Sequence, residues 1–137
     1  MLDYIKSISE RCYNTAVKRG KDVTRKGCML ALMQELKELR HAVAYQLATN
    51  PSPLYACADQ MSDAAFMASY NRLLHNTEAD EIADVIITIA TSYRVDPDDI
   101  TLSYALDAVA GELTPDVREM AEQAVALKMR YNEIRQD

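Results

Sequence analysis

Apolar residues at alternating steps of three and four run through residues 29–47, and this periodicity constrains the fold more than any other feature of the sequence. The series is Met29, Leu32, Leu36, Leu39, Val43 and Leu47. Such spacing places side chains on one face of an α-helix, whereas a strand needs a period of two. The chain also has only three glycines, four prolines and one phenylalanine, which argues against an all-β fold. The sequence therefore predicts an all-α protein.

Capping residues, glycine and proline divide the chain into further helices. The predicted helices are residues 2–19, a helix capped by Asp22 or Thr24 that ends near Thr49, and residues 62–74, 77–95, 97–110 and 115–135. The predicted start and stop signals are Gly20, Ser62, Thr77, Asp96-Pro97, Gly111 and Thr114-Pro115. Two prolines at 51 and 53 end the second helix and predict a loop that reaches Ser62. Residues 1–137 are expected to form a single domain with its own core.

Two acidic pairs lie inside the apolar patterns of two predicted helices. Glu35 and Glu38 stand in the second helix, and Glu81 and Asp84 stand in the helix that follows Thr77. Residues three apart lie on one face of a helix, a single turn apart. Two such helices packed antiparallel would bring four carboxylates to one point. Their mutual repulsion favours a bound divalent cation, and oxygen ligands favour Mg²⁺.

Acidic pairs also occur without any function, because a group of charges usually forms a solvated face. Four other pairs in this chain stand at expected helix starts or on polar faces: Glu78/Glu81, Asp96/Asp99, Asp116/Glu119 and Glu119/Glu122. The pairs Glu35/Glu38 and Glu81/Asp84 differ because apolar residues surround them. The alternative interpretation is a non-catalytic helical interaction module whose acidic residues are only solvated.

A polar line follows the apolar stripe of the last predicted helix. It consists of Lys128, Asn132 and Arg135. One interpretation is that the two cations complement the dipole at the C-terminal end of the helix. The other is that the line has a functional role, since a last helix packed antiparallel to the Asp84 helix would place it opposite the acidic pairs.

Charge and cysteine content exclude several classes of protein. A net charge of −6 disfavours a nucleic-acid duplex or an anionic membrane as a partner. The most apolar run, residues 86–93, is too short to span a bilayer, and the sequence shows no signal peptide. The three cysteines fit no metal spacing and are typical of reduced thiols in a cytoplasmic protein.

Three segments, taken in order, resemble the MazG-like, all-α nucleoside triphosphate pyrophosphohydrolases. They are Glu35-Leu-Lys-Glu38, Asp80-Glu-Ile-Ala-Asp84-Val-Ile-Ile and Lys128-Met-Arg-Tyr-Asn132-Glu-Ile-Arg135. The resemblance covers the first helix through Val95 and resumes at the last helix. It implies a helical bundle of four core helices, with one or two short extra helices, that assembles as a homodimer or homotetramer.

The resemblance also implies a reaction and a division of roles. The expected activity is Mg²⁺-dependent hydrolysis of a canonical or modified nucleoside triphosphate to the monophosphate and pyrophosphate, a housecleaning of the nucleotide pool. The implied ligands of Mg²⁺, or of Mn²⁺ in its place, are Glu35, Glu38, Glu81 and Asp84. The implied catalytic residue, which orients or deprotonates the attacking water, is Glu35. The implied triphosphate-binding residues are Lys128, Asn132 and Arg135.

The sequence departs from the family pattern in ways that leave the substrate open. The stretch between Glu38 and Glu81 is longer than in compact members, and residues 101–119 look inserted. Thr88 stands one turn after Asp84, where some relatives carry an aromatic residue that stacks on a base. Related enzymes of the same architecture that act on phosphoribosyl-ATP or dUTP are therefore alternatives.

Overall fold

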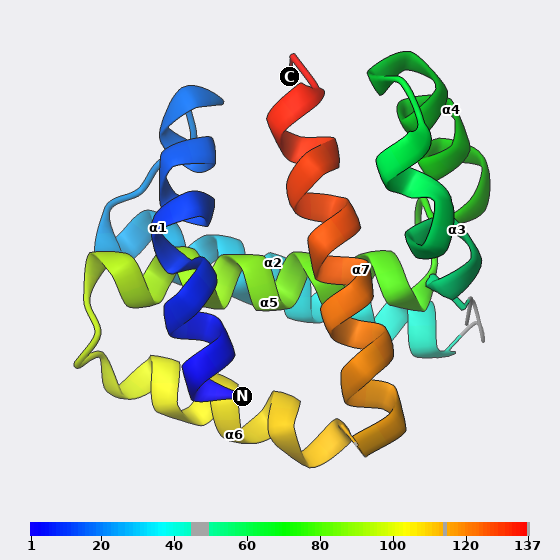
Figure 1. The fold of residues 1–137 in the computed structure, drawn as a ribbon. Coiled ribbons are helices and arrows are strands. Elements are labelled where there is room, and N and C mark those ends of the chain that lie inside the picture. Colours follow the sequence, from blue (N-terminus) through cyan, green and yellow to red (C-terminus); the bar gives the residue numbers. More distant parts are fainter. Residues whose placement is uncertain (45–49, 114, 137) are drawn as a thin grey trace.

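The computed structural model describes residues 1–44, 50–113 and 115–136 (Figure 1). Within these residues it contains seven α-helices and one 3-10 turn but no strand, which confirms the all-α prediction. The helices are α1 (Leu2–Lys18), α2 (Arg25–Ala44), α3 (Ser52–Cys57), α4 (Asp63–Leu73), α5 (Glu78–Val95), α6 (Ile100–Glu112) and α7 (Pro115–Ile134), and the turn η1 (Ala58–Gln60) lies between α3 and α4.

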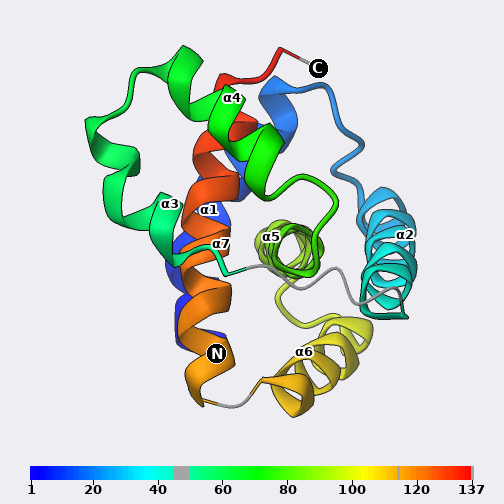
Figure 2. The ribbon, with the colours of Figure 1, turned by 90° about the vertical axis from the view of Figure 1, so that its right-hand side faces the viewer.

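The helix α5 forms the centre of the molecule. It packs against α1, α2, α6 and α7, and Figure 2, which looks along its axis, shows these helices arranged around it. Five of its side chains are at most 1% exposed: Ala83, Val85, Ile86, Ile89 and Ala90. A helix that is apolar around most of its circumference is stable only when other elements cover it. The hydroxyl of Thr77 caps its first turn by accepting the Asp80 N–H, as the sequence predicted.

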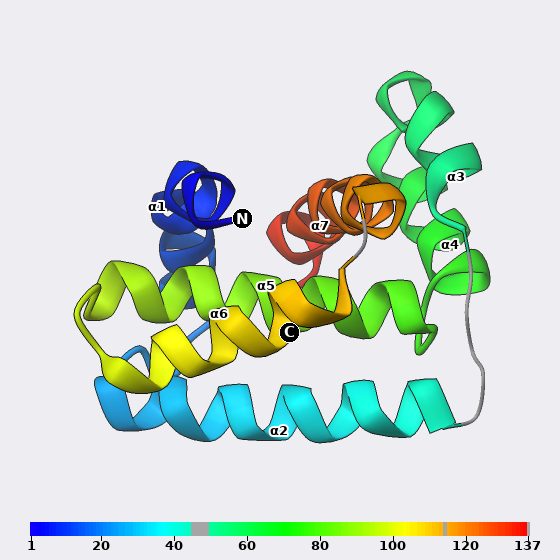
Figure 3. The ribbon, with the colours of Figure 1, turned by 90° about the horizontal axis from the view of Figure 1, so that it is seen from below.

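The helices lie in three layers. Figure 3 shows α2 on one side of α5, with α1 and α7 on the other. The helices α2 and α5 run in opposite directions (Figure 3), which is the antiparallel pairing expected for the two acidic helices. By contrast, α7 crosses α5 at a steep angle, so the antiparallel packing considered for the last helix is wrong. The reason is that α7 lies alongside α1 on the same side of α5 and follows the direction of α1.

Residues 52–60, between the second and third predicted helices, are helical rather than a loop. Pro53 lies within the first turn of α3, where a missing backbone N–H costs nothing. Arg130 of α7 fixes the end of this segment. Its guanidinium donates to the carbonyl oxygens of Ala58 at 2.7 Å and Met61 at 3.0 Å, and it lies 4.3 Å from the centroid of the Phe66 ring.

Three further boundaries differ from the sequence prediction or fall outside the described residues. Helix α6 begins at Ile100 instead of Pro97, because the Asp96 carboxylate accepts the N–H of Asp98 at 3.1 Å and forms a turn before the helix. Both the predicted end of the second helix, near Thr49, and the predicted cap Thr114 lie outside the described residues. The cap predicted at Ser62 is confirmed, since its hydroxyl accepts the Ala65 N–H at 3.2 Å.

The apolar stripe of α2 is covered only in part. Leu32 is 4% exposed, but Met29 is 41% and Val43 is 50% exposed, so one chain leaves part of the stripe uncovered. A single stripe of α2 faces α5, and residues at its margins remain accessible. In the described part of the chain, no helix combines the length and apolar character that crossing a membrane requires.

Candidate functional site

Four carboxylates from two antiparallel helices meet where α2 faces α5. Each of Glu35, Glu38, Glu81 and Asp84 offers an oxygen atom, and these four atoms all lie within 4.8 Å of one another. The spacing of three residues within each pair puts both carboxylates on the side of the helix that faces the other helix. The structure thus brings together all four residues that the sequence indicated as metal ligands.

Two oxygen atoms of this cluster are buried without a partner in the described structure. Glu35 Oε2 and Glu81 Oε2 are inaccessible to solvent and have no hydrogen-bond partner among the described residues. Glu81 as a whole is only 7% exposed. Glu38 is better satisfied, because the Gln34 side-chain amide donates to Glu38 Oε1 at 2.9 Å. An unpartnered buried carboxylate oxygen is costly unless a cation or a proton satisfies it.

The surroundings raise the pKa of three carboxyl groups well above their ordinary values. Burial, followed by the charges of Asp84 and Glu38, raises the pKa of Glu35 to about 8. Burial and the charge of Asp84 raise the pKa of Glu81 to about 7. Burial also raises the pKa of Asp84 to about 6, although the neighbouring Lys128 ammonium acts in the opposite direction. The cluster therefore holds protons near neutral pH when no cation is bound.

Lys128 of α7 lies next to this cluster and is itself buried. It is 4% exposed, and its Nζ lies 2.7 Å from Asp80 Oδ1 and 3.4 Å from Asp84 Oδ1. Nζ is also 5.4 Å and 5.1 Å from the ring centroids of Tyr70 and Tyr131. Burial acts to lower the pKa of Lys128, but the charges of Asp84 and Asp80 outweigh it, so the pKa lies above its ordinary value. This geometry excludes a solvated cation that serves only the helix dipole.

Asp80 is a part of the site that the sequence did not reveal. It is 2% exposed and accepts hydrogen bonds from the Tyr70 hydroxyl, the Asn76 N–H at 2.9 Å and the Lys128 ammonium. In the sequence, Asp80 looks like an ordinary acidic residue in the first turn of a helix. Its role depends on Tyr70 and Lys128, which come from α4 and α7, so only the packing of three helices shows it.

A cleft of about 520 Å³ begins at the carboxylates and continues between α1, α2, α5 and α7. Glu35 and Asp84 line it, and so do all three predicted phosphate-binding residues: Lys128, Asn132 and Arg135. Asn132 is 7% exposed, and its Oδ1 atom has no hydrogen-bond partner in the part of the chain that is described. The two sets of residues that the sequence singled out therefore share one cavity.

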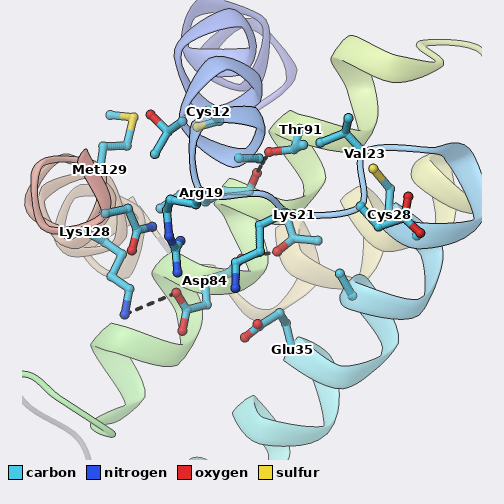
Figure 4. A pocket seen from close by; sticks show the side chains of 18 of the residues that line it. Cys12, Arg19, Lys21, Val23, Cys28, Glu35, Asp84, Thr91, Lys128 and Met129 are labelled. Atoms are coloured by element: carbon cyan, nitrogen blue, oxygen red, sulfur yellow. Dashed lines mark hydrogen bonds and ion pairs between the residues drawn. The ribbon is translucent and has the colours of Figure 1, made fainter. Parts of the chain in front are cut away.

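The two ends of the cleft differ in chemistry. Figure 4 shows charged side chains gathered around Asp84 and Glu35, whereas Cys12, Val23 and Met129 line the opposite part. Thr88 also lines the cleft, and the described lining contains no aromatic side chain. The charged end further includes Arg19 and Lys21, which no sequence pattern assigned to the site. Such a cavity suits a ligand with one anionic end and one less polar end.

The chain matches no family model, no curated protein and no solved structure. The MazG-like resemblance therefore stays a prediction, and the chemistry of the site must follow from its own side chains. Carboxylate oxygens are the ligands that Mg²⁺ and Mn²⁺ prefer. Lysine and arginine side chains around the same cavity suit phosphate oxygens. The arrangement favours a divalent cation together with a phosphorylated ligand.

Proposed function

We propose that this protein is a Mg²⁺-dependent nucleoside triphosphate pyrophosphohydrolase, which splits a nucleoside triphosphate into the monophosphate and pyrophosphate. The observation that supports this most is the convergence of four carboxylates within 4.8 Å at the end of a cleft that Lys128, Asn132 and Arg135 also line. Phosphoryl transfer depends mainly on positioning and charge neutralisation. The site has carboxylates that could hold a metal ion and basic side chains that could face phosphate oxygens. A housecleaning role of this kind belongs in the cytoplasm.

The donor set fits a divalent cation. Its ligands would be Glu35, Glu38, Glu81 and Asp84. The cation would also be a partner for the buried Oε2 atoms of Glu35 and Glu81, which have no partner among the described residues. When bound, Mg²⁺ or Mn²⁺ supplies charge neutralisation for the phosphate oxygens. The non-catalytic alternative fits less well, because acidic residues on a merely solvated face would not be buried with unsatisfied oxygens.

Glu35 is the carboxylate best placed to take a proton from the attacking water. It lines the cleft, whereas Asp84, which also lines it, is paired with Lys128. Without a bound cation, burial and the neighbouring carboxylates raise the pKa of Glu35 to about 8, so its carboxylate has a higher affinity for a proton than an exposed one. Glu35 would accept the proton at the carboxylate oxygen that does not contact the cation.

The residues of α7 would act on the phosphate chain in different ways. Lys128 is fixed by Asp80 and Asp84, so its charge is preorganised at the edge of the carboxylate cluster. Asn132 would satisfy its buried amide oxygen by accepting a hydrogen bond from a donor group on the substrate. Arg135 would contribute a planar guanidinium, which matches phosphate oxygens well. The apolar end of the cleft would receive the nucleoside without aromatic stacking.

Pyrophosphate release from a panel of nucleotides, with and without Mg²⁺, tests the proposal. The panel should contain canonical and modified nucleoside triphosphates, dUTP and phosphoribosyl-ATP. Replacing any of the four carboxylates (Glu35→Gln, Glu38→Gln, Glu81→Gln or Asp84→Asn) should lower turnover at least about a hundredfold. The exposed Glu119 offers a matched control, since Glu119→Gln should leave turnover unchanged. Unaltered Mn²⁺ binding by calorimetry in all four variants would refute the metal site.

We further propose that the four core helices α1, α2, α5 and α7 form one half of a larger helical bundle in a homodimer or homotetramer. The outer face of α2 supports this, because Leu30 is 53% and Met33 is 62% exposed. Contiguous apolar residues on a surface mark an interaction site, and closed symmetric assemblies are the usual solution.

A further inference from the structure

The connection between α1 and α2 places two cations at the charged end of the cleft. Arg19 and Lys21 both line the cavity with Glu35 and Asp84. In Figure 4 the side chains of Arg19 and Lys21 point toward these carboxylates, and Lys128 of α7 reaches Asp84. The carboxylate end is thus flanked by cations from two separate parts of the chain.

The start of this connection is a defined helix cap. Gly20 has a φ of +71°, the left-handed conformation that ends many helices. Its N–H donates to the carbonyl oxygen of Val17, and the N–H of Lys21 donates to that of Ala16, both at 3.0 Å. These two bonds are the Schellman arrangement. It fixes the direction in which the chain leaves α1, and with it the positions of Arg19 and Lys21 on either side of the glycine.

The end of the connection is fixed equally well. Asp22 Oδ1 accepts the N–H and the hydroxyl of Thr24 at 3.0 Å and 2.6 Å, and the Thr24 hydroxyl in turn caps α2 by accepting the N–H of Gly27 at 3.1 Å. A Cβ atom on Gly27 would lie 2.6 Å from the backbone carbonyl oxygen of Asp22. The connection therefore sits directly on the first turn of α2, and the absence of a side chain at Gly27 is what permits this.

The charge of the cleft contrasts with the charge of the whole chain. The charged side chains among its described lining residues are the cations Arg19, Lys21, Lys128 and Arg135 and the anions Asp22, Glu35 and Asp84. Four cations lining one cleft in a protein whose net charge is −6 indicate an anionic ligand once the carboxylates hold a divalent cation. Independently, the amide oxygen of Asn132, 7% exposed and without a described partner, shows that a polar group of the cleft is still unsatisfied.

We propose that Arg19 and Lys21 bind the phosphate chain of the substrate and form, together with Lys128 and Arg135, a two-sided grip on a polyphosphate anion. The inference rests on the proposed function for the identity of the substrate. Binding of a polyphosphate anion, by contrast, requires only the four basic side chains and carboxylates that hold a divalent metal ion. An arginine offers paired N–H donors to phosphate oxygens, and a lysine offers a mobile point charge. The competing account is that Arg19 and Lys21 merely neutralise the carboxylates.

Binding of inorganic tripolyphosphate in the presence of Mn²⁺, measured by calorimetry, separates the two accounts. Lys21→Met and Arg19→Gln should each weaken binding at least about tenfold, the worth of a charge-assisted hydrogen bond. Matched controls are Lys18→Met and Lys26→Met, exposed lysines on either side of the connection that do not line the cleft in the described structure. These controls should bind tripolyphosphate as the wild type does. Circular dichroism melting of every variant establishes that it is folded.

The outcomes distinguish this inference from the proposed function. Equal affinity of the wild type, Lys21→Met and Arg19→Gln for tripolyphosphate, or no binding by the wild type, overturns the grip, even if the enzyme releases pyrophosphate from nucleotides. Tripolyphosphate binding that depends on Arg19 and Lys21, in a protein that hydrolyses no nucleotide, supports the grip and overturns the proposed function.

Discussion

At the scale of single residues, Lys128 and Asp80 form a nearly fully buried ion pair, with side chains 5% and 3% exposed. Removing one member of such a pair leaves the other charge buried without compensation. We expect Lys128→Ala to lower the free energy of unfolding by about 3–5 kcal/mol, measured by urea denaturation. The control is Arg118→Ala, which breaks an exposed pair with Glu122 on the same helix and should cost under about 1 kcal/mol. Equal losses in the two variants would contradict the buried role of Lys128.

The raised carboxyl pKa values predict how stability depends on pH. In the folded protein the pKa of Glu35 is about 8 and that of Glu81 about 7, against an ordinary value of 4.5 for each. Between these limits the folded state binds more protons than the unfolded state, so stability falls as pH rises. We expect the melting temperature of the chelator-treated protein to decrease steadily from about pH 5 to pH 8. The stabilisation that these raised pKa values provide is fully present below the ordinary glutamate pKa of 4.5 and is lost as the pH rises through the folded-state values.

Added metal and the substitution Glu35→Gln should each change how the melting temperature depends on pH. Bound cations require deprotonated carboxylates, so stabilisation by added Mn²⁺ should grow as pH rises. Glu35→Gln removes the group with the highest pKa and should flatten the profile of the metal-free protein. A melting temperature that is constant or rises over the same range without metal would show that the carboxylates are not mutually destabilised.

The sequence could identify the four carboxylates because their pairing depends on local spacing. Glu35 and Glu38 share a helix face whatever the rest of the chain does. The hydrogen bond of Asp80 with Tyr70 joins two helices whose relative placement no periodicity reports. The sequence indicates Arg19 and Lys21 only as a cation on each side of a glycine that ends a helix. By itself that signal describes a helix end as well as it describes a binding site.

At the scale of elements, the connection from Arg19 to Thr24 depends on Gly27. Replacing Gly27 by alanine would favour a helix interior by propensity, but the new methyl group would clash with the backbone of Asp22. We expect Gly27→Ala to displace the connection and to weaken tripolyphosphate binding severalfold, with all four cations of the cleft still present. Nuclear magnetic resonance shifts of residues 19–24 would report the displacement. Unchanged shifts and affinity would show that the connection tolerates the methyl group.

Helix starts were predictable where the cap is local, and helix crossings were not. Ser62 and Thr77 accept the backbone N–H groups that their sequence positions indicate. Asp96 failed as a cap because its carboxylate accepts the N–H of Asp98, and a turn of this kind uses the same residue types as a helix start. The steep crossing of α7 over α5 depends on α1 occupying the same side, which a single helix pattern cannot encode.

At the scale of the whole molecule, the proposed assembly should bury the outer face of α2. Among the described side chains of this helix, the large exposed apolar ones are Met29, Leu30, Met33 and Val43. A second copy of the chain is the partner that the MazG-like resemblance implies, and the same face on each copy would give a closed two-fold interface. We expect light scattering to show a dimer or a tetramer at micromolar concentration.

A charge on that face should disrupt the assembly without unfolding the chain. Met33 is 62% exposed, so Met33→Glu should leave the protomer folded but should make association pay for desolvating a carboxylate, shifting the mass toward the monomer. Leu73→Glu, on α4 and at a residue 40% exposed, is a control of the same chemistry on a different helix and should keep the wild-type mass. If the wild type itself is monomeric, or if both variants dissociate equally, the face of α2 is not the interface. Pyrophosphate release by a monomeric Met33→Glu protein would further show that the carboxylates and cations of one chain complete the site.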